Sequence, residues 1–208
     1  RGEPAVANGW FQRAQRLLEP LPPAPEHGLL GVFMAYGALD EDPAAAAAHA
    51  AAAVSMAEAT GAADIGTLAR ALHGLALVTQ GRAGDGMSLL DEAVAAAISR
   101  EIRDPQWFYF TCCCMIDACD RVRDFGRSLE WCSQLRAFAE RWQVQAFLTT
   151  CRIKFTGVLL WRGEWQAYEV ELERALQELG AERPHVATGA VVRLAELRRR
   201  QGRRREAA

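Results

Sequence analysis

The chain has 208 residues, half of them apolar and about a quarter charged, a composition typical of a folded water-soluble protein. The formal net charge of −2 excludes a strong overall attraction to nucleic acid or to membrane surfaces. No apolar run approaches the ~20 residues that a membrane-spanning helix needs, and the N-terminus has no signal-peptide core. We therefore predict a cytoplasmic protein without membrane contact, and the missing initial Met suggests a piece of a longer protein.

The first predicted elements are helices separated by a proline-rich connector. Apolar residues at helical spacing indicate a short amphipathic helix over 9–21, and four of the eight prolines follow it as a stiff connector. Residues 27–39 are apolar on nearly every side and predict a buried helix. The Asp42-Pro43 pair is a typical helix start, and the Ala-rich run 44–60 predicts a packed helix with small contacts.

A helical hairpin is predicted next, over residues 68–97, with its bend at Gly81. Apolar residues recur at helical spacing on both sides of the bend. They are Leu68, Leu72 and Leu75 before it, and Met87, Leu90, Val94 and Ala97 after it. The bend favours a residue that adopts positive φ, which glycine does without strain. Gly74 and Ala93 are small enough to let the two helices approach closely.

The rest of the chain predicts further helices with short connections. Asp104-Pro105 repeats the Asp-Pro helix start, and no stretch alternates like a strand for more than a few residues. The predicted helices cover 107–121, 124–141, 145–162, 164–179 and 186–201, and residues 203–208 begin one more. The chain is therefore predicted to be all-helical.

These hairpins repeat at an even step when they are aligned on their bends. Gly81, Arg123, Gly163 and Gly202 follow one another at steps of 42, 40 and 39 residues. Twelve residues after the first and third bends come Ala93 and Ala175. Five residues after each bend come Gly86, Ser128, Tyr168 and Ala207, of which only the tyrosine is large. Even spacing favours stacked repeats, and the alternative is a non-repetitive helical bundle.

Small residues at these places resemble those of the tetratricopeptide family. The resemblance is clearest for Gly74, Gly81 and Ala93, and it is partial for Gly163, Ala175, Ala195 and Gly202. The step near 40 exceeds that family's ~34 residues. The resemblance implies an all-α, right-handed α-solenoid of tetratricopeptide-like helical hairpins, forming a single segment over 1–208. The expected hairpins are 1–21 (partial), 27–60, 65–100, 105–141, 145–179 and 186–208 (partial).

A second resemblance covers roughly residues 60–208. The phrases GLALVTQGRAGDGMSLLDEAVAAA and CMIDACDRVRDFGRSLEWC are similar to the helical-repeat region of actinobacterial LuxR-type transcriptional regulators. In such regulators the repeats lie between an ATPase module and a helix-turn-helix. The chain has no G-x-x-x-x-G-K-[ST] loop, and its last residues leave no room for a DNA-reading helix pair. Contact with DNA would therefore belong to a module outside this chain.

The six cysteines, Cys112, Cys113, Cys114, Cys119, Cys132 and Cys151, fall within predicted helices. Their spacing does not give the paired ligands typical of a zinc site, so buried core thiols are favoured. A redox-sensing thiol remains an alternative that would need an exposed electropositive niche. No catalytic motif is present, and we predict neither enzymatic activity nor a bound cofactor.

Two polar residues are candidates for a binding groove. Asp117 lies in an apolar context, and a carboxylate there requires a partner. Arg152, on the next first helix, is the candidate partner, and the pair is either structural or a polar anchor in the concave groove. The arginine-rich stretch from Arg193 to Arg205 predicts a solvated helix face or a junction, with nucleic-acid contact as the alternative.

These observations predict a binding segment rather than a catalyst. We expect a non-catalytic interaction or sensor region of a LuxR-type transcriptional regulator that binds a partner protein, a peptide or a small effector. The alternatives are a stand-alone tetratricopeptide-like scaffold and a repeat region attached to a cyclase or ATPase signalling enzyme. Exposed ends of a stack also predict a possible homo-oligomer.

Overall fold

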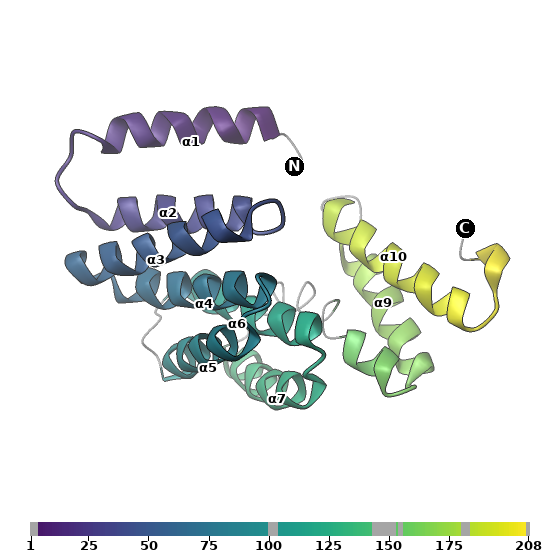
Figure 1. The fold of residues 1–208 in the computed structure, drawn as a ribbon. Helices are drawn as coiled ribbons and strands as arrows, with labels where there is room; N and C mark the ends of the chain where they lie inside the picture. Colours follow the sequence, from purple (N-terminus) through teal and green to yellow (C-terminus); the bar gives the residue numbers. More distant parts are fainter. Residues whose placement is uncertain (1–3, 100–103, 143–152, 154–155, 180–183, 207–208) are drawn as a thin grey trace. The chain divides into compact units, whose positions relative to one another are not determined.

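A computed structural model describes residues 4–99, 104–142, 153, 156–179 and 184–206. All regular structure within these ranges is helical, without a strand, and the helices pack against their neighbours (Figure 1). The prediction of an all-helical chain is confirmed for the described residues. None of the described helices is long and apolar enough to cross a membrane.

The chain divides into two compact units, residues 3–123 (the N-terminal unit) and 124–208 (the C-terminal unit). The helices of the N-terminal unit are α1 (Pro4–Leu18), α2 (Pro25–Ala38), α3 (Pro43–Thr60), α4 (Ala63–Thr79), α5 (Ala83–Ile98) and α6 (Pro105–Val122). Those of the C-terminal unit are α7 (Phe125–Trp142), α9 (Trp165–Leu179), α10 (Pro184–Arg200) and the short 3₁₀ helix η1 (Arg204–Glu206), with residues 156–161 also helical.

Both predicted Asp-Pro helix starts are confirmed. The Asp42 carboxylate accepts a hydrogen bond of 3.0 Å from the Ala45 backbone N–H, and the Asp104 carboxylate accepts one of 2.7 Å from Gln106. Each proline occupies the first turn, where its missing N–H has no partner to lose. Such caps satisfy amide groups that would otherwise be unpaired at the start of α3 and α6.

Helix α4 is the centre of the N-terminal unit, since it packs against α2, α3, α5 and α6. Its residues from Gly66 to Val78 are buried apart from Arg70 and His73. Alanines form the matching face of α3, so the Ala-rich segment is a packed helix. These alanines are Ala46, Ala47, Ala50, Ala53 and Ala57.

The predicted bends lie at residues with a left-handed backbone. Gly81, Gly163 and Gly202 have φ of 84°, 76° and 77°, and Arg123 at the fourth position has φ of 61°. Arg123 is the only residue other than glycine with positive φ in the described part of the chain. Gly61 shares this conformation, with φ of 69°, and ends α3, a position that the repeat alignment did not single out.

Small residues allow α4 and α5 to approach at backbone distance. A Cβ atom built on Gly74 would lie 2.7 Å from the carbonyl oxygen of Gly86, closer than real Cβ contacts come. Ala93 on α5 and Ala175 on α9 are fully buried. The predicted small positions are thus places where helices touch or side chains are enclosed.

Two helix boundaries and the burial of one helix differ from the sequence-based expectations. Helix α1 begins at Pro4 and ends at Leu18, earlier than the predicted 9–21. Between Gly202 and Glu206, the described part of the chain end, the helical residues are the three of η1, a 3₁₀ turn where the sequence predicted the start of an α-helix. Helix α2 is not buried on every side, because Phe33 and Tyr36 are 37% and 54% exposed. Apolar residues all around a helix do not reveal which of them face solvent.

Candidate interaction surface

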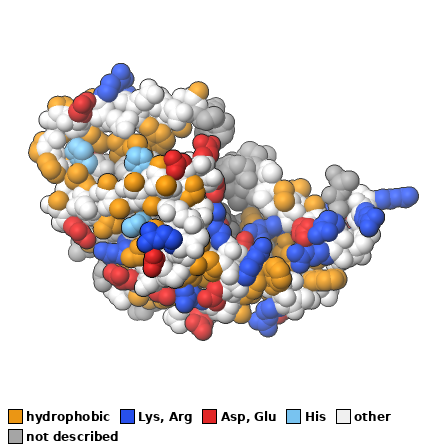
Figure 2. Space-filling model, in the orientation of Figure 1, with side chains coloured by type: hydrophobic (Ala, Val, Ile, Leu, Met, Phe, Trp, Pro, Cys, Tyr) orange, Lys and Arg blue, Asp and Glu red, His pale blue; other side chains and the backbone are white. Residues whose placement is uncertain are grey.

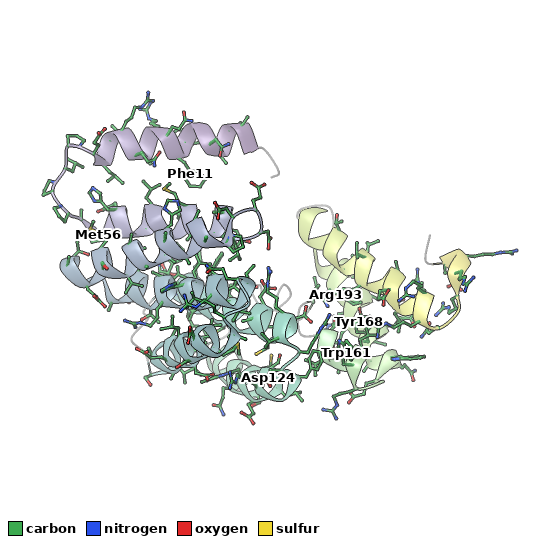
Figure 3. The ribbon with its side chains drawn as sticks, viewed as in Figure 1. Phe11, Met56, Asp124, Trp161, Tyr168 and Arg193 are labelled. Carbon is green, nitrogen blue, oxygen red and sulfur yellow. The ribbon has the colours of Figure 1, made fainter. Side chains whose placement is uncertain are left out.

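Aromatic rings from three helices of the N-terminal unit meet on one surface, here called the aromatic face. Phe11 of α1 lies 6.4 Å from Phe33 of α2 between ring centroids, and Phe33 lies 6.2 Å from Trp107 of α6 in an edge-on arrangement. Tyr36 of α2 meets Phe110 of α6 at 5.1 Å, also edge-on. Figure 3 shows Phe11 on the side of α1 that faces α2. Such aromatic pairs stabilise beyond the area that they bury.

Helical spacing explains why α2 and α6 can form two ring pairs. Phe33 and Tyr36 are three residues apart, as are Trp107 and Phe110, so each pair lies on one face of its helix. Helices α2 and α6 both pack against α4, which brings the rings of α2 into contact with those of α6. At the level of these pairs, aromatic rings therefore fill the space between the two helices, and the accessible part is their outer surface.

A charged contact continues this surface beyond the end of α2. The Arg121 guanidinium of α6 donates a hydrogen bond of 2.8 Å to the Asp40 carboxylate and lies 3.5 Å from the Asp117 carboxylate. Burial opposes the charge of Arg121, but the hydrogen bond to Asp40 and the charge of Asp117 raise its pKa above the ordinary value. The guanidinium therefore stays positive between two carboxylates.

The two sequence-predicted groove residues have different outcomes. Asp117 is partly buried, with 19% of its side chain exposed, and it forms an ion pair with Arg121, one turn later on α6. Arg152, the partner expected from the sequence, lies outside the described residues. Sequence reasoning missed Asp40 and Arg121, although the four-residue spacing of Asp117 and Arg121 was a signal for their pair.

The remaining predicted positions are structural. Gly74 lies at the contact of α4 with α5, while Gly81, Gly163 and Gly202 lie at bends. Ala93 and Ala175 are in the cores of the N-terminal and C-terminal units. None of these residues belongs to the aromatic face.

Cysteines of α6 are mostly core residues. Cys112, Cys114 and Cys119 are buried, whereas Cys113 and Cys132 are partly exposed, and none of these five is in a disulfide. Cys151 lies outside the described residues. Within the described ranges, no three His, Cys, Asp or Glu side chains gather closely enough to hold a metal ion. Burial of three thiols supports their interpretation as small apolar core residues.

The C-terminal unit has its own core and its own exposed aromatic rings, Trp161 and Trp165. Tyr168 is fully buried, and its hydroxyl donates a hydrogen bond of 2.9 Å to the Arg193 carbonyl of α10 (Figure 3). Trp161 is half exposed, stacks on Phe125 at 5.6 Å, and lies 5.6 Å from the Arg200 guanidinium. Phe125 and Arg200 therefore cover part of Trp161, as Phe110 covers part of Tyr36.

Arginines at the end of the C-terminal unit are largely paired with carboxylates. Glu196 accepts hydrogen bonds from Arg199 and Arg200, which lower the pKa of Glu196 to about 2. Arg203 pairs with Glu206 and with Glu169. These pairs support a solvated helix face, as the sequence indicated, over a continuous strip for nucleic-acid phosphates.

Comparison with known proteins gives no further identification of this surface. No protein-family model matches the chain, and no curated protein is significantly similar to it.

Proposed function

We propose that the chain is a non-catalytic interaction segment whose aromatic face binds a partner protein or peptide. The observation that carries this proposal is the exposure of Tyr36 and Phe33, at 54% and 37%, beside the partly exposed rings of α6. Exposed apolar surface costs free energy in water, and contiguous patches of it mark interaction sites. Aromatic side chains are also the residues that most often dominate binding energy.

A right-handed solenoid of tetratricopeptide-like hairpins is the architecture that we propose for this segment. Its support in the N-terminal unit is the neighbour pattern, because α2, α4 and α6 are the first helices of successive hairpins and α4 packs against both of the others. Left-handed residues at Gly81, Arg123, Gly163 and Gly202 support the repeated bends. Stacked hairpins of this kind expose extended surfaces for recognition.

The biological setting that we propose is the sensor region of a LuxR-type transcriptional regulator. Its support is the similarity of the repeat phrases to such regulators, together with the absence of catalytic motifs from the sequence. In this setting, a partner on the aromatic face biases the arrangement of the helices, and modules outside the chain contact DNA. Such coupling requires that the partner binds two arrangements with different affinity.

A transcription reporter driven by the full-length gene product tests this proposal. Replacing Phe33 and Tyr36 by serine removes the exposed rings, and we expect roughly a tenfold loss of signal-dependent response, as for central interface aromatics. Trp10→Ser is the matched control, because Trp10 is 66% exposed and lies outside the aromatic face. Immunoblots and circular dichroism show whether each variant is produced and helical. An unchanged response in the double variant would overturn the proposal.

A further inference from the structure

Charge is distributed unevenly between the two units. Residues 3–123 contain eight basic and fifteen acidic side chains, whereas residues 124–208 contain fifteen basic and eleven acidic ones. The formal net charges are therefore −7 and +4, although the whole chain is close to neutral. Opposite charges of this size attract one another when the units of different molecules meet at low ionic strength.

Three consecutive acidic residues follow the end of α2, which carries Phe33 and Tyr36 of the aromatic face. Asp40, Glu41 and Asp42 form the turn between α2 and α3, and all three are exposed. Asp40 is 79% exposed although it contacts Arg121, and Asp42 caps α3. Glu41 makes no ion pair with a described residue. The carboxylates follow the C-terminal end of α2, whose backbone carbonyls add negative potential.

Tyr36 lies in the last turn of α2, four residues before Asp40 in the sequence, with more than half of its surface exposed. A guanidinium that reaches the carboxylates can therefore also lie against an accessible phenol ring. Arginine binds both partners well, through bidentate hydrogen bonds to carboxylates and through stacking on aromatic rings. The combination favours an arginine-rich segment as the occupant of this surface.

Such a segment is present in the chain itself. Figure 2 shows basic side chains, which are all arginines in this segment, at the α10–η1 end of the C-terminal unit. Arg199, Arg200 and Arg203 have carboxylate partners there. Arg204 and Arg205 are exposed and form no ion pair with any described residue. These two side chains are available to a second molecule.

We infer that two copies of the chain associate through unlike surfaces, with Arg204 and Arg205 of one copy against Tyr36, Asp40 and Glu41 of the other. The inference rests on the proposed function, since it names a second copy as a partner of the aromatic face. Contacts between unlike surfaces join copies head to tail, unlike the self-complementary patch of a two-fold dimer. The contact depends on ionic strength because exposed charges carry most of it.

Sedimentation velocity of the 208-residue chain over a range of concentrations tests the inference. We expect the average mass to rise with concentration at low salt, and the dissociation constant to increase about tenfold or more between roughly 20 mM and 300 mM salt. A monomer at every concentration in low salt would overturn the inference, and so would association that salt does not weaken. Either result would leave the reporter test of the proposed function unaffected.

Charge-reversal variants identify the two surfaces. Arg204→Glu with Arg205→Glu removes the association, and Glu41→Arg weakens it, while Tyr36→Leu reduces it less because the carboxylates remain. Arg13→Glu with Arg16→Glu on α1 is the control, since it changes net charge equally at exposed positions elsewhere. If the control variant lost association as fully as Arg204→Glu with Arg205→Glu, net charge rather than these surfaces would be responsible.

A mixing experiment separates a specific contact from general repulsion. The Glu41→Arg variant and the Arg204→Glu, Arg205→Glu variant each associate weakly or not at all alone. When they are mixed, opposite charges again face one another at the contact. We therefore expect the mixture to associate more tightly than either variant does alone. Because the Glu41→Arg copy keeps Arg204 and Arg205 while the other copy keeps Asp40 and Glu41, a mixture in which both variants stay monomeric would overturn the inferred contact as a whole.

Discussion

Helices α5 and α9 each follow a turn glycine, but the residue five positions after that glycine is the smallest possible in α5 and a large aromatic in α9. Gly86, five residues after Gly81, has no side chain and lets α5 approach α4 at backbone distance. Tyr168, five residues after Gly163, is fully buried and reaches α10 with its hydroxyl. In both helices the residue five positions after the bend is enclosed. The size of that residue then determines whether backbone or side chain fills the space between the helices.

The largest change in stability is expected at alkaline pH in the C-terminal unit, on the tyrosine side of the comparison. Burial raises the pKa of the Tyr168 phenol from 10.0 to about 12. Between these values the native protein retains a proton that the unfolded chain has lost, so stability is full below pH 10 and falls as the pH rises toward 12. Two pKa units correspond to at most about 3 kcal/mol. Urea unfolding monitored by tryptophan fluorescence at several pH values measures this loss.

Tyr168→Phe is the control, because it keeps the ring and removes the group that titrates. At neutral pH this variant loses about 1 kcal/mol, since the Arg193 carbonyl is left without its hydrogen-bond donor. Above pH 10 its stability is expected to fall less than that of the unmodified chain. An equal alkaline loss in both proteins would show that other groups cause it.

The second largest change in stability is expected on replacing Gly86, the glycine side of the comparison. A Cβ atom on Gly86 would lie 2.7 Å from Val78 Cγ2 and 2.9 Å from the Val78 backbone nitrogen. The backbone cannot move as easily as a side chain, so Gly86→Ala should destabilise the N-terminal unit by about 2 kcal/mol. The free energy of unfolding in urea measures the change.

Gly84→Ala provides the matched control on the same helix. A Cβ atom at Gly84 meets nothing within 4 Å, and alanine favours helix more than glycine by about 1 kcal/mol. This control should therefore be neutral or slightly stabilising. If both alanine variants had the same free energy of unfolding, the close approach of α4 and α5 would not explain why position 86 requires glycine.

The sequence predicted regular structure better than it predicted surface. Apolar periodicity and the Asp-Pro pairs identified the described helices to within a few residues at most ends, because these signals are local. The exposure of Phe33 and Tyr36 depends on which neighbours cover α2, and an evenly apolar helix does not contain that information. The pair of Asp40 with Arg121 joins residues 81 positions apart, so no local pattern could indicate it.

The smallest predicted effect concerns the one bend without glycine. Arg123 ends α6 with φ of 61°, a conformation that costs residues with a Cβ atom roughly 1 kcal/mol relative to glycine. Arg123→Gly should therefore raise the free energy of unfolding by about 1 kcal/mol, reduced by the entropy of glycine in the unfolded chain. The ion pair of Arg123 with Asp120 is long, at 3.7 Å, and exposed, so its loss should matter little.

Gly81→Ala is the reciprocal change, because it introduces a Cβ atom at φ of 84° where nothing lies within 4 Å. It should destabilise by a similar amount, through backbone strain and not through a clash. Thermal unfolding of the two variants beside the unmodified chain therefore isolates the cost of the left-handed bend. Opposite signs would establish that the bends at 81 and 123 share one backbone requirement, and a destabilised Arg123→Gly variant would show that the arginine contributes contacts that outweigh its strain.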